Sequence, residues 1–381
     1  MKKNSNIFQE DIKVPEIVLQ KADEAFAGIQ MEGRSTMKKN NQTENRKHTF
    51  WRNPAAVAAC TCIIVAGSVT AGAAVHHVWS RGMQGAVQAT DTQQKELTDK
   101  GAAVVSKEQK DYSKLAVTDN GITITPETII VDKNFAHIAF SVKGYDLAEG
   151  DEPGFDDWNI GVKDGKEGSS VQAYGGFYDG IVSDENGNPV YEDGSSLKED
   201  EQGQIISHYV DEDGNLEYVA SIGVADWKDS LLGKTIVCKL KDLGTLYKTR
   251  FTLAKEGNWD FEIKLPDVST ASNIKVAKGI ENTPFTVDDV ELSPISIKIN
   301  YSVNGEVTFK EDTNQVPQFL GVILKDGKKI SFLGDAGGTG YNEAMTEAYT
   351  LSSFVQVIEP DQVQAIILRN DDGEQIEIPI R

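Results

Sequence analysis

Hydrophobic residues follow three different patterns along the chain, and each pattern predicts a different kind of element. Between residues 14 and 33 they recur every three or four positions, which is the period of an amphipathic helix. From Ala55 to Val75 the chain carries no charged residue. From Val117 onward, apolar residues alternate with polar ones or form short runs rich in β-branched side chains, as in strands. The expected order is therefore a helical segment, an apolar helix and a large β region.

The run from Ala55 to Val75 is long enough to cross a membrane as one helix. A helix of about 20 apolar residues spans roughly 30 Å of hydrocarbon. Trp51 and Trp79 flank the run, as aromatic residues do at a membrane interface. We therefore predict a transmembrane helix over residues 55–78. A cleaved signal peptide is the alternative, because residues 71–73 form a small-x-small pattern, but 54 residues precede the run and a signal peptide begins with a short basic region.

The charges on the two sides of this run differ, and the difference predicts its orientation. Residues 34–52 carry six Lys or Arg and one acid, Glu44, whereas residues 80–100 carry three bases and three acids. Positive residues next to a span stay on the cytoplasmic side. We therefore expect a cytoplasmic arm of residues 1–54 in the cell membrane, and we expect the C-terminal part of the chain to be extracellular.

The arm contains one amphipathic helix, which we expect over about residues 15–31. Pro15 suits the first helical position, and Gly33 follows the last apolar residue of the pattern. A lone helix of this length is marginal in water, so its apolar stripe needs a surface to pack against. That surface is either the inner leaflet of the membrane or a groove on a cytoplasmic protein. The residues expected to bind a partner are Val18, Leu19, Ala22, Phe26 and Ile29.

Beyond the predicted span, residues 79–116 are small, polar and charged, and we expect them to form a stalk. Strand patterns follow, separated by turn sequences such as residues 211–215 (DEDGN) between QIISHYV and LEYVASIGV. A small polar break after Pro266 divides these patterns into two series. The expected fold class is therefore mainly β, with two tandem β-sandwich-like (Ig-like) domains over residues 117–266 and 273–381.

Two segments of the second series depart from the strand pattern. Residues 334–340 (GDAGGTG) are glycine-rich, but they do not form the strand–loop–helix sequence of a phosphate site, so we expect a flexible loop. Residues 342–349 are expected to form a helical turn.

The acidity of the chain lies almost entirely after the predicted span. The formal net charge is -21, and residues 1–54 carry 10 Lys+Arg and 7 Asp+Glu, or +3, which leaves -24 for the rest. Such a surface disfavours nucleic acid and anionic lipid as partners. Of the three cysteines, Cys60 and Cys62 lie in the apolar run and Cys238 stands alone, so no disulfide can form within the exported part. Export without disulfides favours a bacterial surface protein.

Residue types that carry catalysis or bind metals are sparse after the span. His137 and His208 lie within strand patterns without a nucleophile motif, so we expect structural roles for both. One cysteine cannot complete a closed zinc site. Residues 184–188 and 211–215 resemble the start of a calcium loop, but both lack its glycine at position six and its glutamate at position twelve. We therefore predict no enzyme, no metal site and no cofactor.

The order of these parts resembles that of a known family. The arm sequence Ile12–Gln30, the basic tether Met37–His48, the single alanine-rich run and the strands Gly121–Val142 are similar to membrane-anchored anti-sigma-factor-type regulators of Gram-positive bacteria. In that family an exported domain of unknown function follows the span. The later stretch Phe285–Val303, with its Leu292-Ser293-Pro294 step, resembles a second β-rich domain found behind it. The chain lacks the His/Cys zinc signature of one class of anti-sigma domain.

The resemblance implies a role in signal transduction and transcription regulation. The apolar face of the arm would hold an extracytoplasmic-function sigma factor inactive at the membrane, and the exported domains would sense an envelope condition or an extracellular ligand. A surface-anchored binding or adhesion protein, in which the arm is only an anchor, is the alternative. An exported hydrolase is a third interpretation, with His137 and His208 as its candidate residues.

Overall fold

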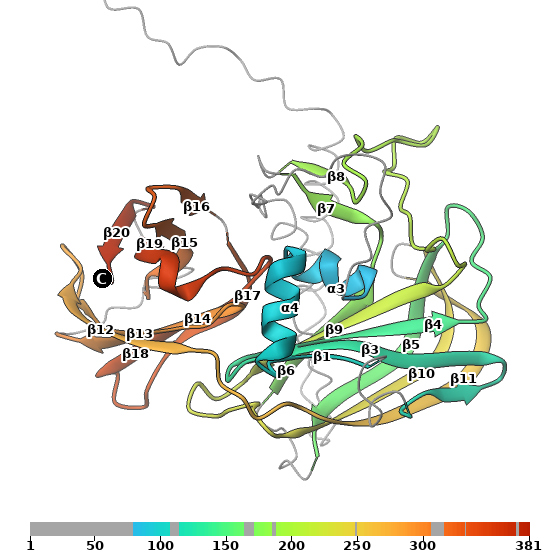
Figure 1. Cartoon of the computed structure of the whole chain (residues 1–381), viewed down its shortest axis with the longest axis horizontal. Helices are drawn as coiled ribbons and strands as arrows, with labels where there is room; N and C mark the ends of the chain where they lie inside the picture. The colour runs from blue at the N-terminus through green and yellow to red at the C-terminus, as the bar shows by residue number, and fades with distance from the viewer. Residues whose placement is uncertain are drawn as a thin grey trace, which may run out of the picture. The chain divides into compact units, whose positions relative to one another are not determined.

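The computed structural model describes residues 79–106, 114–163, 171–184, 188–247, 250–305, 316–331, 333–370 and 373–381. Most of these residues form antiparallel strands in several sheets, which confirms the predicted mainly β fold (Figure 1). The predicted arm helix and the predicted span lie outside the described residues, and so do the expected partner-binding residues Val18, Leu19, Ala22, Phe26 and Ile29. Among the helices that the structure describes, none has the length and apolar character needed to cross a bilayer.

Two sheets enclose a first hydrophobic core, and we call them the first sheet pair. The larger has the order β1-β3-β4-β9-β6, with β2 paired to the first residues of β3, and the smaller has the order β11-β10-β5. Side chains of both sheets meet in one core, for example Phe140 on β4 and Trp259 on β11. The strands are β1 (Ala103–Val105), β2 (Val117–Asp119), β3 (Ile122–Val131), β4 (Phe135–Lys143), β5 (Glu152–Val162), β6 (Val171–Phe177), β9 (Leu216–Val224), β10 (Thr235–Tyr247) and β11 (Arg250–Lys264).

β4 is buried on both faces, which explains its continuous apolar sequence. Ile138 belongs to the first core, whereas the next residue, Ala139, belongs to a separate apolar cluster on the opposite face. β9 pairs with β4 so that Ser221 lies opposite His137 and Glu217 lies opposite Ser141. Polar side chains of two neighbouring strands are therefore brought together on a face that other segments cover.

Residues 178–215 form an insert between β6 and β9. It contains the short strands β7 (Ile181–Ser183) and β8 (Pro189–Tyr191), which pair with each other. The sequence QIISHYV, for which we predicted a strand, forms only isolated bridges at Ile205 and Val210. The predicted turn after it is confirmed, because the Asp211 carboxylate accepts backbone hydrogen bonds from Asp213 (2.9 Å) and Asn215 (2.7 Å).

A second sheet pair encloses a second core. Its sheets have the orders β12-β13-β14-β18-β17 and β16-β15-β19-β20, and Val287, Phe354 and Ile366 meet between them. The 3-10 helix η1 (Pro360–Gln362) precedes β19. The strands are β12 (Ser272–Gly279), β13 (Phe285–Leu292), β14 (Ser296–Val303), β15 (Gln318–Leu324), β16 (Lys329–Ser331), β17 (Gly334–Tyr341), β18 (Glu347–Phe354), β19 (Val363–Arg369) and β20 (Gln375–Pro379).

Two predictions in this region are wrong. The glycine-rich loop is the edge strand β17, and the expected helical turn is the turn and first residues of β18. Gly337 has φ 150° and sits so close to β18 that an added Cβ would lie 2.0 Å from the Leu351 carbonyl oxygen. Glycine is therefore needed for strand pairing here. The Asn342 side chain closes the hairpin by accepting the Thr346 amide at 2.9 Å.

The predicted stalk is also wrong for residues 79–106, which we call the strap. The strap contains α3 (Arg81–Ala86), α4 (Asp91–Asp99) and β1, and a capping box at Thr90 and Gln93 starts α4. α3 packs on β4 and β9, and α4 packs on β1 (Figure 1). Small residues let the strap lie close to the sheet, and its few large apolar side chains are buried there. These are Trp79, Met83, Val87 and Leu97.

Candidate functional site

The strap begins directly after the predicted span, and Glu217 on β9 binds its backbone there. One carboxylate oxygen accepts the Arg81 amide (3.1 Å) and the other accepts the Gly82 amide (2.6 Å). Hydrogen bonds from a carboxylate to the first amides of a helix are favourable, because those amides have no partner within the helix. An added Cβ at Gly82 would lie 2.9 Å from the Glu217 oxygen, so a larger residue there would have to displace the Glu217 side chain.

Burial of Glu217 changes its acidity. Glu217 is 6% exposed. Burial raises the pKa of the Glu217 carboxyl above its usual value, and the Gly82 amide lowers it in part. Burial removes water from the carboxylate, and its hydrogen bonds to the strap amides replace part of that hydration.

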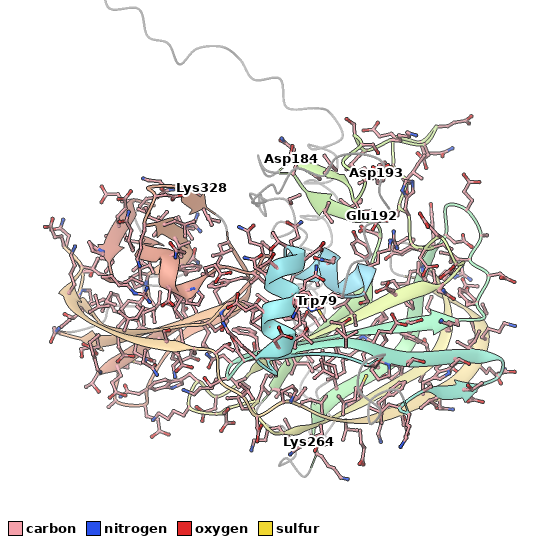
Figure 2. The ribbon with its side chains drawn as sticks, in the orientation of Figure 1. Trp79, Asp184, Glu192, Asp193, Lys264 and Lys328 are labelled. Carbon is pink, nitrogen blue, oxygen red and sulfur yellow. The ribbon has the colours of Figure 1, made fainter. Side chains whose placement is uncertain are left out.

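The two preceding amides are also bonded to side chains. The Trp79 amide donates to the Gln94 side-chain oxygen (3.0 Å), and the Ser80 amide donates to the Thr128 hydroxyl on β3 (3.0 Å). Trp79 is 2% exposed and lies beside α4 (Figure 2). Four successive backbone amides at the start of the described chain are therefore bound by side chains of the fold.

The Arg81 side chain ties the strap to the insert. Its Nε lies 2.7 and 2.8 Å from the two carboxylate oxygens of Glu192, which follows β8 (Figure 2). Its terminal nitrogens donate to the carbonyl oxygens of His208 and Tyr209, and the guanidinium carbon lies 4.7 Å from the centre of the Tyr178 ring. The guanidinium is mostly buried, so these contacts fix the strap against residues that a stalk would not touch.

The strap also packs against the sheets through a cluster of apolar side chains. It joins strap side chains to residues of both sheet pairs, which makes the strap a connection between them. The strap contributes Trp79, Met83, Val87, Leu97, Ala102, Ala103 and Val105, the first sheet pair contributes Ile130 and Ala139, and the second contributes Ile295 and Val357.

The strap meets the second sheet pair at Gln88. The Gln88 amide donates to the Val355 carbonyl (2.8 Å), and its carbonyl accepts the Val357 amide (2.8 Å), which forms an isolated parallel bridge to Gln356. The Gln93 side chain adds a bond to the Val357 carbonyl (3.3 Å).

A second buried carboxylate joins the two sheet pairs directly. Asp132, at the end of β3, is 1% exposed, and one of its oxygens accepts the amides of Asn134 (2.8 Å) and Phe135 (2.7 Å). Its other oxygen accepts the hydroxyls of Ser293 and Ser296 from the second sheet pair. Burial raises the pKa of the Asp132 carboxyl, and the two serine hydroxyls lower it in part. We call this contact the serine joint.

Cationic and aromatic side chains extend the serine joint. The Lys133 ammonium pairs with the Glu291 carboxylate at 2.7 Å. Lys298 on β14 donates to the Trp227 carbonyl (2.6 Å) and lies 4.8 Å from the centre of that indole ring, which stacks on Tyr349 at 5.3 Å. Burial lowers the pKa of Lys298.

The histidines that sequence analysis considered have different surroundings. His137 is 2% exposed, and its Nδ1 lies 2.9 Å from the Ser221 hydroxyl. Burial lowers the pKa of His137 to about 4, so the ring is neutral near pH 7. The His208 ring stacks on Tyr191 with 4.1 Å between ring centres. Within the described ranges, no group of three or more His, Cys, Asp or Glu side chains is placed to hold a metal ion.

Sequence reasoning missed the residues that bind the strap. Glu217 is an acid inside the apolar strand sequence LEYVASIGV, and Asp132 directly follows the buried run IIV. An acid within or directly after a buried strand is a usable signal, because burying a carboxylate requires several hydrogen-bond donors. Trp79 fitted the membrane interface equally well in the sequence, so nothing there separated the two interpretations.

Comparison with known proteins gives one family match, over residues 46–144, to a domain of unknown function (DUF4179). The matched range includes the strap and strands β1 to β4. No curated protein matches the chain. A solved structure, described as the crystal structure of the conserved domain protein from Bacillus anthracis, is similar over 70% of this chain and 89% of that one, with 12% identity and a TM-score of 0.41.

Proposed function

We propose that the chain is a single-span membrane regulator, an anti-sigma factor whose N-terminal arm binds an extracytoplasmic-function sigma factor. Its exported β part responds to a signal outside the membrane. We interpret that part as two tandem Ig-like domains, residues 117–266 and 273–381, with residues 1–54 in the cytoplasm. One observation carries the proposal: directly after the predicted span, the Trp79 amide is bound by α4 and the next three amides are bound by strands of the β fold.

Close attachment matters because a flexible stalk would absorb movement of the exported part. The amides of Trp79, Ser80, Arg81 and Gly82 are each held by a side chain of the fold. A rearrangement that moves β9 or α4 therefore moves the end of the predicted span as well. This supports transmission of a signal through the span rather than simple anchoring.

The family match supports treating the span and the strap as one module. It runs from residue 46, within the predicted basic tether, to residue 144, just after β4. The matched family is described as one of unknown function, so the match supports the arrangement of parts and contributes nothing on the partner.

The test is capture of a sigma factor from membranes by the full-length chain. We expect the wild-type protein to retain one after crosslinking, and Phe26→Asp/Ile29→Asp to lose it, because charges on the apolar stripe prevent its burial in a groove. Lys21→Ser/Glu24→Ser, on the opposite side of the predicted helix, serves as the matched control and keeps the sigma factor.

Two results would contradict the proposal. Capture of no sigma factor by the wild type would favour the surface-anchored binding or adhesion protein. Equal capture by the wild type and by Phe26→Asp/Ile29→Asp would show that the arm's apolar stripe is not the contact.

A further inference from the structure

We propose that the middle of the strap separates from the second sheet pair while both of its ends stay bound to the first. This opening is a property of the fold, and it holds with or without a sigma factor. The reason is that more hydrogen bonds hold the strap to the first sheet pair than to the second.

The contact with the first sheet pair has the larger number of hydrogen bonds. Both carboxylate oxygens of Glu217 accept strap amides, and the Thr128 hydroxyl accepts a third. At the other end of the strap, β1 pairs with β3 over three residues, Ala103–Val105. Charge-assisted and ladder hydrogen bonds of this kind must all break before either end can leave.

The contact with the second sheet pair rests on fewer bonds. A single parallel bridge joins Gln88 to Gln356, with one side-chain bond from Gln93 beside it. The side-chain oxygen of Gln88 and the side-chain nitrogen of Gln356 are both buried, and neither has a hydrogen-bond partner in the described part of the chain. Opening would hydrate both groups, so their burial without partners opposes closing of this side.

Two cavities lie at the same contact. One of about 130 Å³ is lined by Leu97, Pro294 and Val357 among others, and one of about 140 Å³ is lined by Gly85, Gln88 and Val355 together with Ile181, Val182, Ser183 and Pro189 of the insert. Both cavities are open to solvent, so the strap makes fewer protein contacts there. Unpaired polar groups and incomplete packing therefore coincide where the strap meets the second sheet pair.

Hydrogen exchange of single amides tests this order of opening. Exchange in the full-length chain, held in detergent micelles, is measured by mass spectrometry with fragmentation that resolves single amides. The amides of Gln88 and Val357 report the second side, and the amide of Gly82 reports the first. We expect the first two to exchange at least about 10-fold faster than Gly82 after correction for intrinsic rates.

A variant tests whether the unpaired side chains weaken the contact with the second sheet pair. Gln356→Leu removes one unpaired buried donor, so we expect the amides of Gln88 and Val357 to exchange about threefold more slowly, with Gly82 unchanged. Gln375→Leu, at an exposed position on β20, is the matched control and leaves all three rates as they are.

Two outcomes would overturn the inference. Equal exchange at Gly82 and Gln88 would mean that the strap opens as one unit, and faster exchange at Gly82 would mean that it opens from the first sheet pair. If Gln356→Leu does not fold, the comparison of these amides in the wild type decides the question alone. None of these measurements uses the arm, so they are independent of sigma-factor capture.

Discussion

Glu217 and Asp132 are both buried carboxylates of the first sheet pair, and each holds a neighbouring segment, but they bind different groups. Glu217 accepts two backbone amides of the strap. Asp132 accepts two serine hydroxyls of the second sheet pair, while its other oxygen binds the backbone of its own turn. Burial raises the pKa of both carboxyls, so both depend on these bonds for compensation.

The difference determines which substitutions each contact tolerates. A contact to backbone amides does not depend on the side chains that carry them, but it leaves little room for a Cβ, as at Gly82. A contact to hydroxyls depends on Ser293 and Ser296 themselves. The strap contact should therefore be sensitive to added volume, and the serine joint to loss of a hydroxyl.

The largest expected effect comes from removing the side chain that anchors the strap beside the Glu217 contact. Trp79→Ala should lower the free energy of unfolding by about 3–5 kcal/mol, because the indole is 2% exposed and a cavity would replace it. Denaturant unfolding of the full-length chain measures this loss. Trp158→Ala, at a tryptophan that is 38% exposed, is the control and should cost much less. Equal losses would mean that the strap is not part of the stable fold.

Gly82→Ala tests the sensitivity of the strap contact to volume. The new Cβ would lie 2.9 Å from the Glu217 oxygen, so we expect a loss of about 1–3 kcal/mol in unfolding free energy. Gly161→Ala on β5, where nothing lies within 4 Å of an added Cβ, is the matched control and should be neutral or slightly stabilising. If both variants unfold like the wild type, backbone recognition by Glu217 does not require glycine.

Ser296→Ala tests the dependence of the serine joint on its hydroxyls. Asp132 keeps three of its four bonds in this variant, so the expected loss is about 1 kcal/mol. Ser302→Ala on the same strand removes a hydroxyl that bonds the partly buried Asp288, and it should cost less. A larger loss in Ser302→Ala would contradict the role that we assign to the joint.

The smallest expected effect is a pH dependence that the two carboxylates share. A carboxyl whose pKa is raised by folding stabilises the fold fully at low pH, and this contribution is lost as pH rises through the folded-state pKa. The melting temperature of the wild type, relative to Glu217→Gln or Asp132→Asn, should therefore rise as pH is lowered from neutral towards the ordinary carboxyl range. His137 changes stability with pH in the opposite direction, because burial lowers its pKa to about 4. The test is therefore the difference in melting temperature between the wild type and each carboxylate variant, in which the His137 contribution cancels. A relative melting temperature that falls as pH is lowered would contradict the assigned directions.

Much of the β fold could be predicted because its strands carry clear patterns. β3 begins with the alternation Ile122, Ile124, and β4 is a continuous apolar run buried on both faces. The turn at Asp211 followed from side-chain chemistry that acts over a few residues. Such local signals are readable without knowledge of the tertiary structure.

The strap and β17 could not be predicted, for two physical reasons. The partners of the strap amides lie far away in sequence, since Thr128 is 48 positions from Ser80 and Glu217 is 136 positions from Arg81, so no local pattern contains them. β17 consists largely of glycine, which leaves few side chains to alternate and places the strand by close backbone approach instead. The arm residues, Phe26 and Ile29 among them, remain predictions.

The bond from Gln93 to Val357 also determines the order in which the protein can assemble. Its two ends are 264 positions apart, so the strap emerges from the ribosome early and its second contact surface emerges near the end of synthesis. This contact cannot form until Val357 has been synthesised, whereas the last strand of the first sheet pair ends at Lys264. Every newly made molecule therefore passes through a period in which the strap is held by the first sheet pair alone.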